Sequence, residues 1–238
     1  MQGKNDIVIP LGNKSFNQKN MEIIIAVSSI LKYCNFRNRI IIVGAEPPSI
    51  IKDKVIHIQA DDKFTHCKDA NIIYKVKVAI ETISDLTDDF IIWSDDQFIT
   101  KPTEWSDTTP RYIKKYDSTT IWYFNIMSRT RVWWKRLQAT LENFKSPNFF
   151  NPHIPSPVNK TIFLNMCKEF NIEKRTDITI FSLYYNYAGI EGVPNFDEYH
   201  CNSGETDWKN ARWVGYFNSS IQNPNFRKSV ETMFDIKL

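Results

Sequence analysis

Two adjacent carboxylates, Asp95 and Asp96, directly follow a run of apolar residues from Phe90 to Trp93. Two like charges about 4 Å apart repel by roughly 4 kcal/mol at an effective dielectric constant near 20. A divalent cation between them turns this repulsion into attraction, and carboxylate oxygens are ligands that suit Mg²⁺ or Mn²⁺. An acid pair that only begins a loop or caps a helix is the alternative. The position of the pair, at the end of an apolar segment, favours a cation site.

The first half of the chain alternates between two kinds of pattern. Apolar runs typical of buried strands occupy residues 6–12, 39–44, 54–62 and 89–96. Helical spacing of apolar residues occurs between them, at residues 20–34 and 68–83. This alternation predicts an α/β fold with a mostly parallel sheet and helices on both faces. Ligands bind outside the carboxyl ends of such strands, so the acid pairs 61–62 and 95–96 are predicted to line one cleft.

The second half is richer in aromatic residues and has fewer clear strand–helix units. Residues 120–125 are predicted to form a strand, and residues 130–144 an amphipathic helix. Another helix is predicted to begin near Val158, because Pro157 suits an early helical position. No convincing linker or internal repeat interrupts the chain. We therefore expect residues 1–238 to form a single domain.

Composition narrows the class of protein. The chain has 238 residues and can bury a sizeable core without a disulfide framework. Its net charge of +3 is too small to indicate bulk nucleic-acid binding. The four cysteines form no C-x-x-C pair, and no apolar run is long enough to span a bilayer. The first residues lack the apolar core of a signal peptide, so a cytoplasmic protein is expected.

The order of these segments resembles a known family. The runs "DIVIPLGN", "RIIIVG", "IHIQADD" and "FIIWSDDQF", with helical patterns between them, resemble a GT-A glycosyltransferase over roughly residues 5–105. The resemblance implies a GT-A-like, Rossmann-type mixed sheet and a nucleotide-sugar donor whose base lies near the end of the first strand. We therefore expect a nucleotide-sugar-binding half, residues 1–105, and an acceptor-binding half, residues 106–238.

Candidate contacts to that donor lie at the strand ends and on the second helix. They are Pro10, Leu11, Gly12, Asp61, Asp62, Asn71, Lys75 and Asp95. A positive side chain such as Lys75 could stabilise the departing diphosphate, and Asn71 shares its helix face one turn earlier. A solvated surface charge is the alternative reading of Lys75.

The resemblance also implies a DxD-type motif that binds Mn²⁺ or Mg²⁺ against the diphosphate. This chain departs from a strict DxD, because residues 94–96 read Ser-Asp-Asp and the next residue is Gln97. Asp96 is the first candidate ligand and Asp95 the second, with Asp95 alternatively contacting the ribose or the donor sugar. His153, in "NPHIPSP", could complete the metal shell, contact the acceptor or act as a base. His200 is the rival late ligand.

An inverting transfer also needs a carboxylate that takes the proton of the acceptor hydroxyl. Asp207 is the first candidate for this catalytic base and Asp197 the second, although each is also typical of a surface acid. The segments "TDITIFSLYYN" and "ETDWK" resemble parts of phage-encoded GT-A enzymes that modify DNA bases. A glycan and a hydroxymethylated base of phage DNA are therefore both candidate acceptors.

Two other functions stay open. "SDDQF" is also similar to the "NDD" motif of Stealth-type sugar-phosphate transferases, which implies transfer of a sugar 1-phosphate in the same metal cleft. The basic and aromatic residues of "SRTRVWWKRLQ", at 128–138, suit nucleic-acid binding or a helix that buries its tryptophans and solvates its charges. The favoured prediction is a metal-dependent transferase that moves a hexose from UDP or another nucleotide to a hydroxyl.

Overall fold

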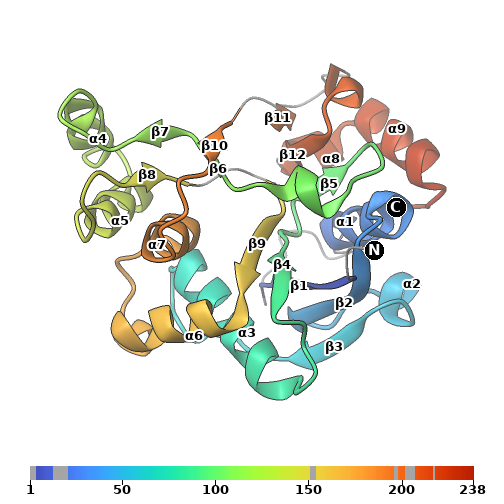
Figure 1. Ribbon diagram of the computed structural model, residues 1–238. Helices are drawn as coiled ribbons and strands as arrows, with labels where there is room; N and C mark the ends of the chain where they lie inside the picture. Colours follow the sequence, from blue (N-terminus) through green and yellow to red (C-terminus); the bar gives the residue numbers. More distant parts are fainter. Residues whose placement is uncertain (1–3, 13–20, 151–153, 196–197, 202–206, 217) are drawn as a thin grey trace.

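The central sheet has five strands in the order β3-β2-β1-β4-β9 (Figure 1). Their bounds are β1 (Asn5–Leu11), β2 (Arg37–Gly44), β3 (Ile56–Gln59), β4 (Asp89–Ile92) and β9 (Ser156–Asn159). The strands β1 to β4 are parallel, and β9 pairs antiparallel with β4. The computed structural model describes residues 4–12, 21–150, 154–195, 198–201, 207–216 and 218–238. The predicted mostly parallel sheet is confirmed.

Helices cover both faces of this sheet because successive side chains leave a strand on opposite sides. In β1, Ile7 and Ile9 pack with α1 (Met21–Tyr33), whereas Val8 packs with α3 (Lys68–Thr82). All three side chains are fully buried, and burial of each contributes about 2 kcal/mol. The strands β2 and β4 alternate in the same way, so the sheet is the shared wall of two apolar clusters.

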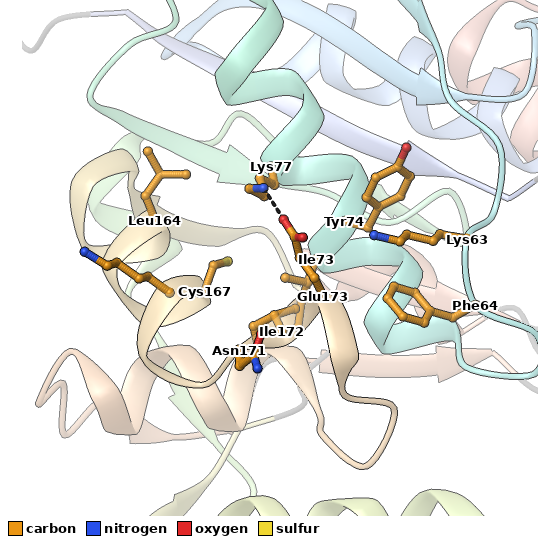
Figure 2. A pocket seen from close by; sticks show the side chains of 11 residues that line it. Lys63, Phe64, Ile73, Tyr74, Lys77, Leu164, Cys167, Asn171, Ile172 and Glu173 are labelled. Carbon is orange, nitrogen blue, oxygen red and sulfur yellow. Dashed lines mark hydrogen bonds and ion pairs between the residues drawn. The ribbon is translucent and has the colours of Figure 1, made fainter.

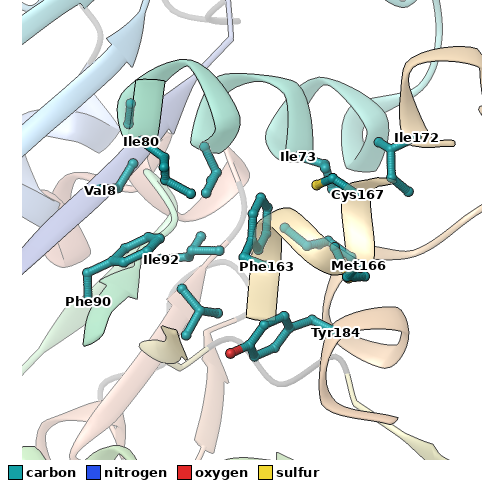
Figure 3. Packing of buried hydrophobic residues seen from close by; sticks show 14 of the residues in the cluster. Val8, Ile73, Ile80, Phe90, Ile92, Phe163, Met166, Cys167, Ile172 and Tyr184 are labelled. Atoms are coloured by element: carbon teal, nitrogen blue, oxygen red, sulfur yellow. The ribbon is translucent and has the colours of Figure 1, made fainter. Parts of the chain in front are cut away.

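The layer beneath α3 contains residues from the second half of the chain (Figure 3). Phe163 of α6 and Tyr184 of α7 belong to the same apolar cluster as Ile73 of α3 and Phe90 of the sheet. The bounds of these helices are α6 (Lys160–Glu169) and α7 (Ile180–Tyr187). Residues from both halves of the chain therefore pack into one apolar core.

A second sheet has three strands in the order β11-β12-β5. Only β5 directly follows β4 in the chain, and the other two strands come from its last part. Its strands and the helices beside it are β5 (Gln97–Ile99), β11 (Glu198–Cys201), β12 (Trp213–Tyr216), α8 (Asn218–Gln222) and α9 (Pro224–Phe234). Phe98 of β5 lies at the centre of their apolar cluster, with its ring centroid 5.3 Å from that of Trp208 and 5.6 Å from that of Tyr216. This packing holds β5 in place directly after the acidic pair.

Residues 114–149 form a unit to one side of the sheets, next to α7, which we call the α4–α5 lobe (Figure 1). It comprises β7 (Lys114–Lys115), α4 (Ile121–Met127), α5 (Val132–Leu141) and β8 (Asn148–Phe149). Its apolar cluster contains Phe124, Leu137, Leu141 and Phe149, and none of these residues belongs to the clusters around the sheets. The lobe therefore has a small core of its own.

One predicted element of the second half is wrong, and one predicted helix begins two residues later than expected. Residues 120–125 were expected to form a strand, but α4 begins at Ile121 and packs the fully buried Phe124 against α5. No helix begins at Val158, because Pro157 and Val158 belong to β9, at the edge of the sheet where proline is tolerated. The helix α6 begins two residues later and is capped by Asn159 Oδ1, which accepts hydrogen bonds from the amides of Thr161 and Ile162.

Short elements connect these units. They are α2 (Ser49–Lys52), η1 (Trp105–Thr108), β6 (Arg111–Tyr112), η2 (Ile172–Lys174), β10 (Val193–Pro194) and η3 (Asp207–Asn210). Among the described residues, no helix is both long enough and apolar enough to cross a membrane.

Candidate active site

The acidic pair forms the turn between β4 and β5, with both side chains partly buried. Both sides of the turn are fixed by hydrogen bonds. The indole Nε1 of Trp93 donates to the carbonyl of Gln97 (3.3 Å), and the amide of Tyr216 donates to the carbonyl of Asp96 (3.2 Å). The pair therefore lies at the carboxyl end of a central parallel strand, where ligands bind in sheets of this kind.

Negative charge accumulates at this turn. Burial and then the neighbouring charges of Asp96 and Glu22 raise the pKa of Asp95 to about 6, although the positive charge of Lys68 opposes the shift. The pKa of the buried Tyr216 hydroxyl is likewise raised by burial, then by Glu22 and the two aspartates. A cation bound here would offset the repulsion between these carboxylates.

One positive side chain, that of Lys68, lies close enough to neutralise part of this negative charge. Lys68 begins α3, and its Nζ lies 3.7 Å from Asp96 Oδ2 while 70% of the side chain stays exposed. The charges of Asp96 and then Asp95 raise the pKa of Lys68. An exposed ammonium group in this position can pair with the carboxylate or with an anionic ligand. The sequence analysis named neither Lys68 nor Glu22, although Lys68 begins the predicted helix that follows the acids 61–62.

Lys75 connects three of the predicted donor contacts. Its side chain is 1% exposed, and Nζ donates to the carbonyl of Leu11 (2.6 Å) and to Asp62 Oδ1 (2.5 Å). The end of β1 is thereby tied to the segment after β3. The alternative reading of Lys75 as a solvated surface charge is wrong, because the helix turns this side chain toward the sheet.

Gly44 allows this close arrangement at the end of β2. Its φ of +134° lies in a region that side chains rarely adopt. A Cβ atom here would also lie 1.9 Å from the Leu11 carbonyl oxygen and 3.0 Å from Lys75 Nζ. Only glycine permits the end of β1 to approach β2 this closely.

Asn71 holds the segment between β3 and α3. Its Oδ1 accepts from the amide of Phe64 and its Nδ2 donates to the carbonyl of the same residue, both at 2.8 Å. It lies one turn before Lys75 on α3, as the sequence analysis expected. Asp61 is exposed, and its Oδ1 accepts from the Gln59 side chain at 3.4 Å. Pro10 and Gly12 lie at and just beyond the end of β1, partly exposed.

The remaining predicted site residues are only partly visible. His153 and Asp197 lie outside the described residues, as does the side chain of Asp207, which begins η3. In the part of the chain that is described, no three His, Cys, Asp or Glu side chains converge as a metal centre. Asp95 and Asp96 thus offer two adjacent oxygen donors that fit Mg²⁺ or Mn²⁺, and a complete shell needs ligands from elsewhere.

A cavity of about 300 Å³ lies on a different side of α3 (Figure 2). Its walls come from α3, α6 and the segment around η2, and they include Tyr74, Leu164 and Cys167. An ion pair between Lys77 Nζ and Glu173 Oε1 (2.5 Å) joins two of its walls. Neither Lys68 nor the acidic turn lines it, so it is distinct from the candidate site.

Comparison with known proteins supports the fold. No protein-family model and no curated protein sequence matches the chain. Its structure is similar to that of galactosyltransferase LgtC in complex with donor and acceptor sugar analogs, with a TM-score of 0.52 and 11% sequence identity. That match covers 98% of this chain and 96% of the other. An active-site mutant of LgtC matches with a TM-score of 0.51 and 11% identity, over 94% and 95% of the two chains. The predicted GT-A-like fold is confirmed.

Proposed function

We propose that this chain is a metal-dependent glycosyltransferase that moves a hexose from a nucleotide-sugar donor to a hydroxyl group. The observation that carries this proposal is the position of the acidic turn at the carboxyl end of β4, in a fold shared along nearly its whole length with a galactosyltransferase. LgtC was solved with donor and acceptor sugar analogs, and the same classes of ligand are proposed for this chain.

Asp95 and Asp96 are the proposed ligands of Mn²⁺ or Mg²⁺, with His153 as the candidate third ligand. When bound, the cation supplies positive charge against the diphosphate of the donor as that group departs. The support for this assignment is the adjacency of two carboxylates at the turn, where burial and then the charge of Asp96 raise the pKa of Asp95.

Two lysines have different proposed roles. Lys68 has an exposed ammonium group beside the acids and is proposed to bind the donor phosphates directly. Lys75 is buried and already bonded to Leu11 and Asp62, so we assign it a positioning role at the donor-facing end of β1. Asn71 supports the neighbouring segment in the same way.

The acceptor is proposed to bind on the side of the second half, residues 106–238. Asp207 and then Asp197 are the candidate bases for the acceptor hydroxyl, as the sequence analysis expected. The candidate acceptors remain a glycan and a hydroxymethylated base of phage DNA. Each presents a hydroxyl nucleophile, so the proposed chemistry at the donor is the same for both.

Ligand-dependent stability tests the donor and the metal together. We expect a nucleotide sugar such as UDP-galactose or UDP-glucose to raise the melting temperature when Mn²⁺ is present. A ligand at 100 times its dissociation constant adds about 2.7 kcal/mol to the free energy of unfolding. A screen of nucleotide sugars in which none stabilises the chain, with or without metal, would contradict the proposal.

The variant Asp96→Asn tests the site assignment. We expect transfer of radiolabelled sugar to fall at least about 100-fold, because the variant loses a charged metal ligand while the fold is kept. Asp88→Asn is the matched control, since Asp88 lies just before the opposite end of the same strand, and its 82% exposed side chain pairs, among the described residues, only with Lys160 on the surface. Full turnover by Asp96→Asn would contradict the assignment of Asp96 as a metal ligand. A product whose new linkage contains phosphorus would instead favour a sugar 1-phosphate transferase.

A further inference from the structure

The α4–α5 lobe concentrates positive charge. Residues 114–149 contain seven basic side chains and two acidic ones, a net charge of +5, whereas the whole chain has +3. The rest of the molecule is therefore net negative, at −2. Arg129, Arg131 and Lys135 are exposed around the turn between α4 and α5. Within the described part of the chain, none of these three forms an ion pair with another side chain.

The same lobe exposes large apolar side chains. Trp122 is 60% exposed, Ile126 is 54% exposed and Val132 is 66% exposed. Trp122 and Ile126 each lie about 160° around α4 from the buried Phe124, because an α-helix turns about 100° per residue. They therefore point away from the core of the lobe. The indole Nε1 of Trp122 donates to the carbonyl of Thr119 (2.9 Å), which fixes the ring at the surface.

We propose that the α4–α5 lobe is a docking surface for an anionic lipid membrane. Exposed tryptophan and aliphatic side chains bordered by arginine and lysine are the composition of segments that lie in the bilayer interface. The apolar side chains can enter the acyl boundary while the basic ones pair with anionic headgroups. Nucleic acid is the other polyanion that suits the charge. Ile126 and Val132 argue against it, because aliphatic side chains cannot stack on bases as aromatic rings do.

Docking would bring the candidate active site close to the membrane. Arg136 of α5 donates from Nη2 to the carbonyl of His66 (3.1 Å), two residues before Lys68. The lobe is thus attached next to the amino end of α3, where Lys68 pairs with Asp96. An acceptor carried on the membrane would then lie near the acidic turn. Membrane binding itself goes beyond the proposed transfer reaction and does not depend on it.

Sedimentation with vesicles tests the proposal without any measurement of activity. We expect the chain to bind vesicles of equal parts phosphatidylglycerol and phosphatidylcholine, and not vesicles of phosphatidylcholine alone. The triple variant Arg129→Ser, Arg131→Ser, Lys135→Ser should weaken partitioning on the order of 100-fold, from about fivefold per charge. The double variant Trp122→Ser, Ile126→Ser should weaken it about tenfold or more, since it removes the inserted apolar groups.

A matched control removes three exposed lysines from other elements. Lys54→Ser, Lys168→Ser, Lys228→Ser makes the same change in net charge, and its partitioning should fall less than about threefold because those positions lie outside the lobe. Equal losses in the two triple variants would overturn the proposal, as would the absence of binding to anionic vesicles. Binding to duplex DNA that survives Trp122→Ser, Ile126→Ser, without vesicle binding, would overturn it in favour of nucleic acid.

Discussion

At the scale of single residues, the acidic turn holds two neighbouring carboxylates in a partly buried position. Asp95 is partly buried beside Asp96 and near Glu22, and its pKa is raised to about 6. At neutral pH the metal-free protein keeps the Asp95 carboxylate ionised despite its burial and the negative charges of Asp96 and Glu22. Sites that bind ligands commonly keep such unfavourable charges, because the ligand removes the cost.

We predict that Asp95→Asn stabilises the metal-free protein. A carboxyl whose pKa is raised on folding contributes stability below its ordinary pKa, and that contribution is lost as pH rises through about 6. Asparagine cannot ionise, so the variant should exceed the wild type by about 1–2 kcal/mol in free energy of unfolding above pH 7. The difference should vanish near pH 4.

Urea unfolding in the presence of a chelator, at both pH values, measures this difference. Asp88→Asn is again the control, because its side chain is 82% exposed and its removal should have little dependence on pH. A stability difference for Asp95→Asn that does not change with pH would contradict the raised pKa.

At the scale of secondary-structure elements, a buried ion pair fixes the amino ends of the central strands. Asp6 of β1 is fully buried, and Arg39 of β2 donates to it from Nε (2.9 Å) and Nη2 (2.7 Å). Burial raises the pKa of Asp6, but the bonds from Arg39 and the amide of Thr87 outweigh it and hold the pKa below its ordinary value. Arg39 also bonds Asp85, whose side chain is 76% exposed.

We predict that Arg39→Ala costs about 3 kcal/mol of unfolding free energy, because it leaves the Asp6 carboxylate buried without its charged partner. Asp85→Ala removes only the exposed partner and should cost less than about 1 kcal/mol. Denaturant unfolding of both variants near neutral pH makes the comparison. If the two variants lose equal free energies of unfolding, the Asp6–Arg39 ion pair does not hold the two strands together.

The wrong strand at residues 120–125 and the shifted start of the helix after Pro157 share a cause. In β9, Pro157 pairs opposite Ile91 in an antiparallel edge strand, a partner 66 residues earlier in the chain. In α4, Phe124 is buried by residues of α5 and β8. Both segments are short, and short apolar segments take their conformation from the surface they pack on.

At the scale of the whole molecule, the apolar core is divided into clusters of different size. Two large clusters share the central sheet as a wall, and a third lies around β5 and β12. The α4–α5 lobe has the smallest, with four buried residues. A unit with so few buried contacts is expected to open at lower free energy than the sheet.

We predict that Leu137→Ala destabilises the lobe locally. Leucine-to-alanine changes in a core cost 2–5 kcal/mol or thereabouts, and Leu137 is fully buried in the cluster of the lobe. Hydrogen exchange should accelerate in residues 121–141, while the amides of β1 and β2 keep their protection. Leu183→Ala, in the cluster beneath α3, is the control and should accelerate exchange in the central sheet. Uniform acceleration by Leu137→Ala would show that the lobe does not open separately.

The sequence by itself determined the central architecture and one edge of the candidate site. Continuous apolar runs and helices with regular spacing depend on local pattern alone, so β1 to β4, α1 and α3 could be placed from the sequence. The parallel arrangement then put Asp95 and Asp96 at the carboxyl end of β4, where sheets of this kind bind ligands. It also placed Lys75 on the helix beside them.

Only the tertiary structure decided which distant side chains meet that edge. Glu22 and Lys68 approach the acidic turn from α1 and α3, and Tyr216 approaches it from β12. Packing between elements far apart in the chain sets these contacts, and no local spacing encodes them. The outward position of Trp122 and Ile126 has the same origin. These two side chains are exposed because α5 and β8 pack against the opposite face of α4, which carries Phe124.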